Sequence, residues 1–78
     1  IKIHPNPSSD FVSISFPSYT TSAKIEIADA LGKIVLSKEI VINSNEYLLD
    51  TEAISKGIYY LSIINGNNKN TYTIIKKK

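Results

Sequence analysis

The residues that most constrain the fold are 57–64, Gly-Ile-Tyr-Tyr-Leu-Ser-Ile-Ile, the longest run rich in β-branched and aromatic residues. The run contains no proline and no charge, a composition that favours a strand at the centre of a sheet. Side chains alternate between the two faces of a strand, so Tyr59, Leu61 and Ile63 share one face. We expect that face to lie in the core, because the opposite face carries the polar Ser62.

The other predicted strands are shorter and are separated by turn residues. They cover residues 11–16, 23–29, 33–40, 46–50 and 69–76, with a short opening strand over 1–3. Turn-forming sequences recur about every 8–12 residues, the spacing of sandwich folds, and no segment keeps a helical period over three turns. The sequence therefore predicts an all-β fold, a small immunoglobulin-like β-sandwich of about seven antiparallel strands in two sheets.

Alternation also predicts which side chains fill the core. The expected core residues are Val12, Ile14, Ile25, Ile27, Leu49, Tyr59, Leu61 and Ile63. In segment 33–40 the inward face stays open, because odd-numbered and even-numbered apolar residues compete, and a bulge near Gly32 would shift the register. Between residues 51 and 56 we expect a single turn that places Ile54 under the sheet.

Composition limits the chain to one small domain, which we take to span residues 1–78. The absence of cysteine excludes stabilising disulfides. Nine lysines, no arginine and seven acids give a net charge of +2, a weaker basic bias than nucleic-acid-binding domains have, so we expect no nucleic-acid partner. No apolar run approaches the roughly 20 residues of a membrane span, and these residues contain no signal-peptide pattern. Methionine is absent even from position 1, so we expect the chain to be cut from a longer polypeptide.

The residues that could carry chemistry are few. His4 is the only histidine, whereas a nitrogen-and-sulfur metal site needs three or four ligands and a hydrolytic triad needs a positioned base. The acidic residues are scattered and lack the spacing of a calcium loop. We therefore expect no metal, no cofactor and no enzymatic activity. The five tyrosines suit cross-strand packing, although a row of exposed rings could also stack on sugars.

Four short motifs follow one another along the chain. The first is Pro5-Asn6-Pro7, followed by Asp10; its two prolines hold the chain extended. The second, residues 27–33, is an apolar strand that runs into Asp-x-x-Gly-Lys, and the third, residues 54–59, is Ile-Ser-Lys-Gly-Ile-Tyr. The fourth is the basic end, residues 74–78, with the sequence Ile-Ile-Lys-Lys-Lys.

In this order and over almost the whole chain, the motifs resemble those of the type A C-terminal sorting domain of the bacterial type IX secretion system. His4 stands where that family commonly has tyrosine, Ile54 replaces a leucine, and Thr73 replaces a frequent lysine. The resemblance implies a signal that targets an N-terminal cargo in the same chain through the outer membrane of Bacteroidota-type bacteria. The implied partners are the type IX secretion machinery and a sortase-like surface peptidase, which removes the domain and often joins the cargo to lipopolysaccharide. The implied location is secreted or at the cell surface, reached through the periplasm and the outer membrane.

The resemblance also implies which residues carry recognition. They are Pro5, Asn6, Pro7, Asp10, Asp29, Gly32, Lys33, Lys56, Gly57, Tyr59, Lys76, Lys77 and Lys78. We expect the prolines and glycines of this set to shape the backbone and all five lysines to be exposed. We also expect the secretion machinery to read the final strand, as an edge strand, together with its lysines 76–78. The alternative function is that of a carbohydrate-binding module of a secreted enzyme, which would need two or three tyrosine rings exposed on one sheet.

Overall fold

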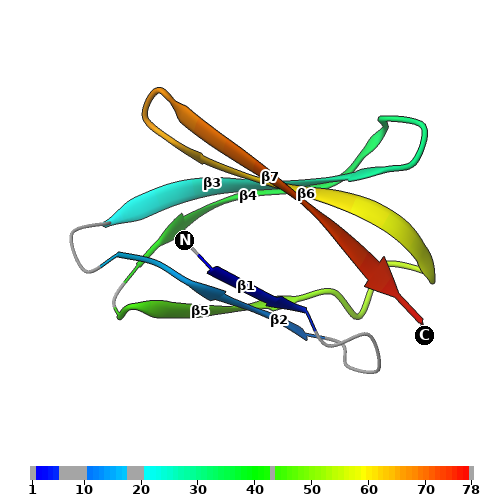
Figure 1. Ribbon diagram of the computed structural model, residues 1–78, viewed down its shortest axis with the longest axis horizontal. Helices are drawn as coiled ribbons and strands as arrows, with labels where there is room; N and C mark the ends of the chain where they lie inside the picture. The colour runs from blue at the N-terminus through cyan, green and yellow to red at the C-terminus, as the bar shows by residue number, and fades with distance from the viewer. Residues whose placement is uncertain (1, 6–10, 18–20, 43, 78) are drawn as a thin grey trace.

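A computed structural model of the chain describes residues 2–5, 11–17, 21–42 and 44–77. The strands are β1 (Lys2–Pro5), β2 (Phe11–Ser15), β3 (Ser22–Asp29), β4 (Ile34–Val41), β5 (Glu46–Asp50), β6 (Gly57–Asn65) and β7 (Asn68–Lys76). They form a three-stranded sheet of order β1-β2-β5 and a four-stranded sheet of order β4-β3-β6-β7. The two sheets lie face to face (Figure 1), and every strand pair is antiparallel. The predicted all-β sandwich is confirmed.

The core between the sheets is built from the side chains that strand alternation predicted. All eight expected core residues are buried, and Ile14, Ile25, Ile27, Leu49, Leu61 and Ile63 are almost completely enclosed. Ile54, on the turn after β5, is buried as well. Removal of this apolar surface from water is the main favourable contribution to folding, and it requires both sheets to be present at once.

β6 occupies an inner position of the four-stranded sheet, between β3 and β7. Its residues Tyr59, Leu61 and Ile63 face the other sheet, whereas Ile58 and Tyr60 lie half-exposed on the outer surface. The expected core face of this strand is therefore confirmed. The hairpin from β6 to β7 turns at Gly66, whose φ of +62° is one that residues with a side chain rarely adopt.

The strand that sequence alternation left undecided is β4, and a bulge decides it. Ile27 of β3 pairs with Leu36, but the next residue, Ala28, pairs with Ile34, so Val35 is an extra residue on β4. Beyond the bulge Leu36 is partly buried and Ile40 is buried, while Ile34 and Val35 remain half-exposed. The expected bulge near Gly32 is thus present, a few residues farther along the strand.

The opening strand is longer than predicted. β1 continues to Pro5, which pairs with Val12 of β2, whereas we expected a strand over residues 1–3. β1 is an edge strand, where a proline without an N–H group is tolerated because one side of the strand needs no ladder partner. We also predicted a turn at residues 8–10, which lies outside the described residues, and a loop over 19–22, of which residues 19 and 20 lie outside them and Ser22 belongs to β3.

Candidate recognition end of the sandwich

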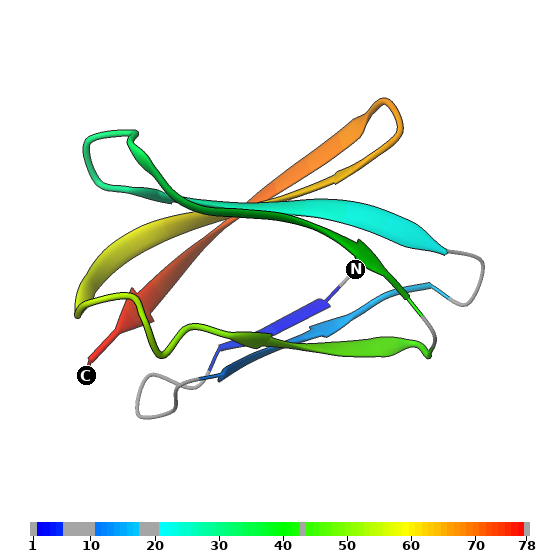
Figure 2. The same ribbon diagram turned by 180° about the vertical axis from the view of Figure 1, so that it is seen from behind.

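Parts of all four motifs lie at the same end of the sandwich. In the three-stranded sheet Pro5 pairs with Val12, and Phe11 pairs with Asp50, so the end of β1 lies beside the end of β5. The segment 51–56 leads from there to the start of β6 in the other sheet. We call this segment the β5–β6 corner; Figure 2 shows it passing from one sheet to the other.

The four-stranded sheet brings the other motifs to the same place. Asp29, the last residue of β3, pairs with Tyr59, and Gly57 pairs with Lys76 at the end of β7. The β3–β4 hairpin, the β5–β6 corner and the C-terminal end of the chain therefore share one end of the molecule (Figure 1). We call it the motif end. Residues that are far apart in the sequence thus form one surface.

The β3–β4 hairpin is held by the side chain of Asp29. One carboxylate oxygen, Oδ1, accepts hydrogen bonds from the backbone N–H groups of Leu31 and Lys33, both at 2.9 Å. The backbone adds bonds from Asp29 N–H to the Lys33 carbonyl at 2.8 Å and from Gly32 N–H to the Asp29 carbonyl at 3.0 Å. Gly32 has a φ of +87°, which a residue with a Cβ adopts only under strain. Asp29 and Gly32 therefore shape the hairpin, and the Lys33 side chain stays exposed.

The start of β6 is tied back to the β5–β6 corner by Tyr59. Its buried ring carries a hydroxyl that donates a hydrogen bond to the Ser55 carbonyl at 2.6 Å. A tyrosine near the start of a strand that bonds back to the backbone of the preceding corner is the arrangement called a tyrosine corner in immunoglobulin-like sandwiches. A Cβ at Gly57 would lie 3.6 Å from the Tyr59 ring, and Gly57 has a φ of +153°. Gly57 and Tyr59 therefore fix how the chain enters the central strand.

The β5–β6 corner also has an anchored interior. Ile54 is buried, and its N–H donates to the Thr51 carbonyl at 3.1 Å, closing the predicted single turn. Asp50 Oδ1 accepts a hydrogen bond from the Glu52 N–H at 2.9 Å, which orders the first residues of the turn. The corner is therefore a shaped element rather than a loose connection between the sheets.

Lys76 does not lie where we expected it. The prediction that all the motif lysines are exposed is wrong for this residue, which is buried, with 7% of its surface accessible. It faces inward because every second side chain of β7 points toward the core, and Tyr72, Ile74 and Lys76 are on that side. Its Nζ donates a hydrogen bond to the backbone carbonyl of Thr51, so the buried charge has an acceptor. Lys76 therefore connects the last strand to the β5–β6 corner.

Three other motif lysines, Lys33, Lys56 and Lys77, are exposed as expected. Asn6, Pro7, Asp10 and Lys78 lie outside the described residues, and for Pro5 only the backbone is described. Sequence reasoning missed the carbonyl groups of Thr51 and Ser55 as anchor points, and no side-chain pattern could have shown them. It also missed Leu31, which is 95% exposed on the hairpin; an apolar residue inside a predicted turn was the available sign.

The four tyrosines that the structure describes do not supply the row of exposed rings that sugar stacking would need. Tyr59 is buried, Tyr47 and Tyr72 are partly buried against the core, and Tyr60 is half-exposed. Tyr19 lies outside the described residues. The carbohydrate-binding alternative therefore gains no support from the described tyrosines.

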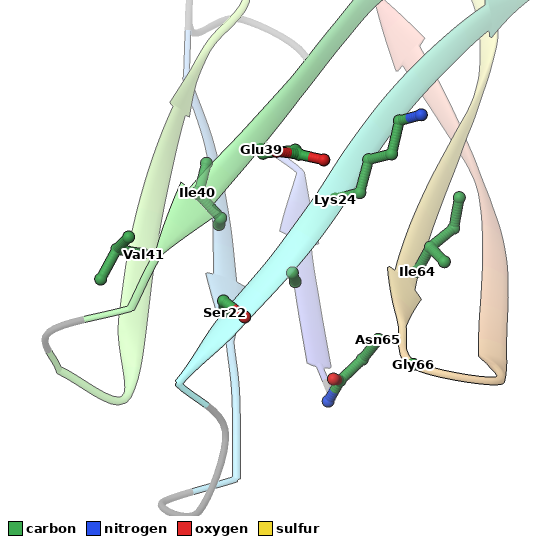
Figure 3. A pocket seen from close by; sticks show the side chains of 9 residues that line it. Ser22, Lys24, Glu39, Ile40, Val41, Ile64, Asn65 and Gly66 are labelled. Carbon is green, nitrogen blue, oxygen red and sulfur yellow. The ribbon is translucent and has the colours of Figure 1, made fainter.

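Figure 3 shows a hollow at the opposite end of the four-stranded sheet, beside the β6–β7 hairpin. Its volume is about 620 Å³, and Lys24, Glu39, Ile64 and Asn65 are among the residues that line it. None of the motif residues that the structure describes contributes to it. Within the described ranges, no group of three or more His, Cys, Asp and Glu side chains is placed to hold a metal ion. No helix in that part of the chain is long and apolar enough to cross a membrane.

Comparison with known families gives one result that covers nearly the whole chain. A family model described as a secretion system C-terminal sorting domain matches residues 2–77. The matched range includes all four motifs and lacks only the last residue of the fourth, Lys78. No curated protein sequence matches the chain.

Proposed function

We propose, from the premise that this chain belongs to the family of secretion system C-terminal sorting domains, that it carries an N-terminal cargo of the same polypeptide across the outer membrane. Membership makes the chain a sorting signal of type IX secretion and the protein that bears it a secreted or cell-surface protein. Domains of this family are typically non-catalytic. What remains to be proposed is which surface is read, and what happens to the domain afterwards.

The observation that carries the proposal is the convergence of the motifs at the motif end. There the β3–β4 hairpin, the β5–β6 corner and the end of β7 are each fixed by hydrogen bonds of their own. β7 is an edge strand, and an edge offers backbone N–H and C=O groups to a partner strand. We propose that the secretion machinery reads this end as a folded shape and recognises the charges of Lys77, which is exposed, and of Lys78.

The later steps are proposed from the family resemblance. A sortase-like peptidase at the cell surface would remove the domain and join the cargo to lipopolysaccharide. Residues 1–78 would then form a single module with no role after export. The motif residues outside the described part of the chain, Asn6, Pro7 and Asp10, would belong to the surface that is read before removal.

The test is secretion of a fusion in which residues 1–78 follow a folded reporter protein, expressed in a bacterium with type IX secretion. We expect the parent fusion in the medium or at the cell surface, and the reporter without the domain in the periplasm. The change Lys77→Ala with Lys78→Ala should trap the fusion in the periplasm without changing its melting temperature. Lys76 stays unchanged in this variant because it is a buried, hydrogen-bonded residue.

The matched control is Lys69→Ala, which removes an exposed lysine from the other end of β7. It should be secreted at the parental level. If the Lys77 and Lys78 variant were secreted as well as this control, the two lysines would not be part of the surface that is read. If the parent fusion itself stayed in the periplasm, the chain would not be a sufficient sorting signal.

A further inference from the structure

The outer surface of the four-stranded sheet carries an exposed apolar patch at the motif end. Its members are Ile34, Ile58, Tyr60 and Ile75, which are 49%, 52%, 42% and 51% exposed. They are neighbours in the sheet: Ile58 pairs with Ile75, and Ala28 pairs with both Ile34 and Tyr60. We call these four residues the outer patch. A contiguous exposed apolar surface on a small domain marks an interaction site.

A polar row separates the outer patch from Val41 and Ile64, the apolar residues at the other end of the same surface. The next row across the sheet is Ser37, Glu26, Ser62 and Thr71. In that region Lys24 and Glu26 form an ion pair at 3.6 Å, and the Ser62 and Thr71 hydroxyls lie 3.1 Å apart. An exposed strand position needs no apolar residue to favour the strand, because threonine has a high strand propensity too. β7 has threonine at two such positions, 71 and 73. The apolar side chains at the motif end therefore need another explanation.

Positive charge borders the outer patch. Lys33 directly precedes Ile34 of the patch. Lys56 directly precedes Gly57, and Gly57 pairs with Lys76, the residue before Lys77. Within the described residues none of these three ammonium groups has an ion-pair partner.

The acidic groups that the structure describes at the motif end are directed elsewhere. Asp50 and Glu52 line a separate hollow together with Lys38 of β4, and the Asp29 carboxylate accepts the backbone bonds of the hairpin. The border of the outer patch therefore complements an acidic surface.

We propose that the outer patch is a docking surface for a protein of the export route whose contact surface is apolar at its centre and acidic at its edge. This inference rests on the proposed sorting function and names the surface that its partner covers. Burial of the four apolar side chains supplies affinity, and the three lysines pair with the partner's carboxylates. A protein suits the site better than a lipid bilayer, because the patch adjoins the edge of β7, whose backbone groups need hydrogen-bond partners that hydrocarbon lacks.

The first experiment changes the outer patch without changing the fold. In the reporter fusion, Ile58→Thr with Tyr60→Thr retains strand-forming residues at exposed positions. We expect secretion to fall at least about tenfold, as for loss of a binding hot spot, with an unchanged melting temperature. Two single controls, Val41→Thr on the same sheet and Leu48→Thr on the other sheet, remove exposed apolar side chains far from the patch and should be secreted normally.

The second experiment tests the chemistry of the partner. A photo-crosslinking residue at position 60 should join the fusion to a protein during export, and the same residue at position 48 should not. Reversing the border charges with Lys33→Glu, Lys56→Glu and Lys77→Glu should abolish the crosslink. Reversal at Lys69, on the same strand but at the other end, should leave it intact.

Four outcomes would overturn the proposal. One is secretion of the patch variant at the parental level, in an experiment where the parent fusion is exported and the reporter without the domain is not. The sorting function would then stand, and only the role of the outer patch would be excluded. A second is a crosslink that survives charge reversal. The third is patch-dependent binding to phosphatidylglycerol vesicles, which would make a membrane the occupant. The fourth is a patch-dependent dimer in sedimentation, which would make it a second copy. A parent fusion that is not exported would instead contradict the sorting function itself.

Discussion

Lys76 Nζ donates a hydrogen bond to the backbone carbonyl of Thr51, a residue 25 positions earlier in the chain. Thr51 directly follows the three-stranded sheet, and Lys76 ends the four-stranded sheet. Both residues are buried. The bond therefore connects the last strand to the segment that joins the two sheets, and the position of the chain's basic end depends on a correctly formed corner.

Replacing Lys76 by methionine should destabilise the domain. The substitution keeps a long, flexible side chain but removes the charged donor from the buried Thr51 carbonyl, which retains the hydrogen bond from the Ile54 N–H. Loss of one hydrogen bond that involves a charged group costs about 1.5–3 kcal/mol. Urea unfolding followed by circular dichroism would measure the loss. Lys77→Met is the control and should change the free energy of unfolding little, because the side chain is exposed. Equal stability of the two variants would contradict a connecting role for Lys76.

Replacing Tyr59 by phenylalanine should lower stability by about 0.5–1.5 kcal/mol, the net value of one intramolecular hydrogen bond. The variant keeps the buried ring but loses the donor to the Ser55 carbonyl and a weaker 3.5 Å contact with the Ser55 hydroxyl. Tyr60→Phe removes a hydroxyl from a half-exposed ring on the next position and serves as the control. A similar change in melting temperature for both variants would mean that the hydroxyl at position 59 does not hold the corner.

Replacing Asp29 by alanine should destabilise the β3–β4 hairpin by about 1 kcal/mol, because two backbone N–H groups lose their side-chain acceptor. Asp29→Asn keeps an oxygen acceptor without the charge and should retain most of the stability. Hydrogen exchange at the amides of Leu31 and Lys33 reports the effect locally. Equally fast exchange in the two variants would show that the charge, rather than the acceptor, matters.

Replacing Leu61 by alanine should cost about 2–5 kcal/mol through lost burial and the cavity left behind. A domain of this size has a total stability of only about 4–12 kcal/mol, at roughly 0.05–0.15 kcal/mol per residue. The variant should therefore unfold at a much lower urea concentration. Leu48→Ala, at a position that is 61% exposed, should leave the midpoint nearly unchanged. A small shift for Leu61 would contradict its place in the core.

Most of the fold was predictable because strand faces follow from geometry alone. Side chains alternate with a period of two, so Val12, Ile14, Ile25 and Ile27 were assigned to the core without knowledge of their partners, and all four are buried. Turn residues marked the boundaries for the same local reason: Gly32 and Gly66 adopt positive φ angles where the hairpins turn. Local sequence limited these choices before any tertiary contact formed.

The face of β4 and the place of Lys76 were not predictable in this way. An extra residue at Val35 reverses the alternation of β4 relative to its start, and a bulge is decided by how two strands fit together. The inward face of β7 reaches Lys76 at the strand's last position. A lysine at this position is buried only if an acceptor lies nearby, and here the acceptor is the Thr51 carbonyl. Every residue has a backbone carbonyl, so the sequence does not show which one will serve.

By itself, then, the sequence determined about seven strands, the core faces of β2, β3, β5 and β6, the turns between strands and the order of the motifs, since each depends on residues close together in the chain. Only the tertiary structure decided that the motifs share one end, that Lys76 is interior while Lys33, Lys56 and Lys77 are exposed, and that an apolar patch adjoins these three lysines. The physical reason is that antiparallel pairing and the crossing from β5 to β6 set which distant residues become neighbours, and no local pattern contains that information.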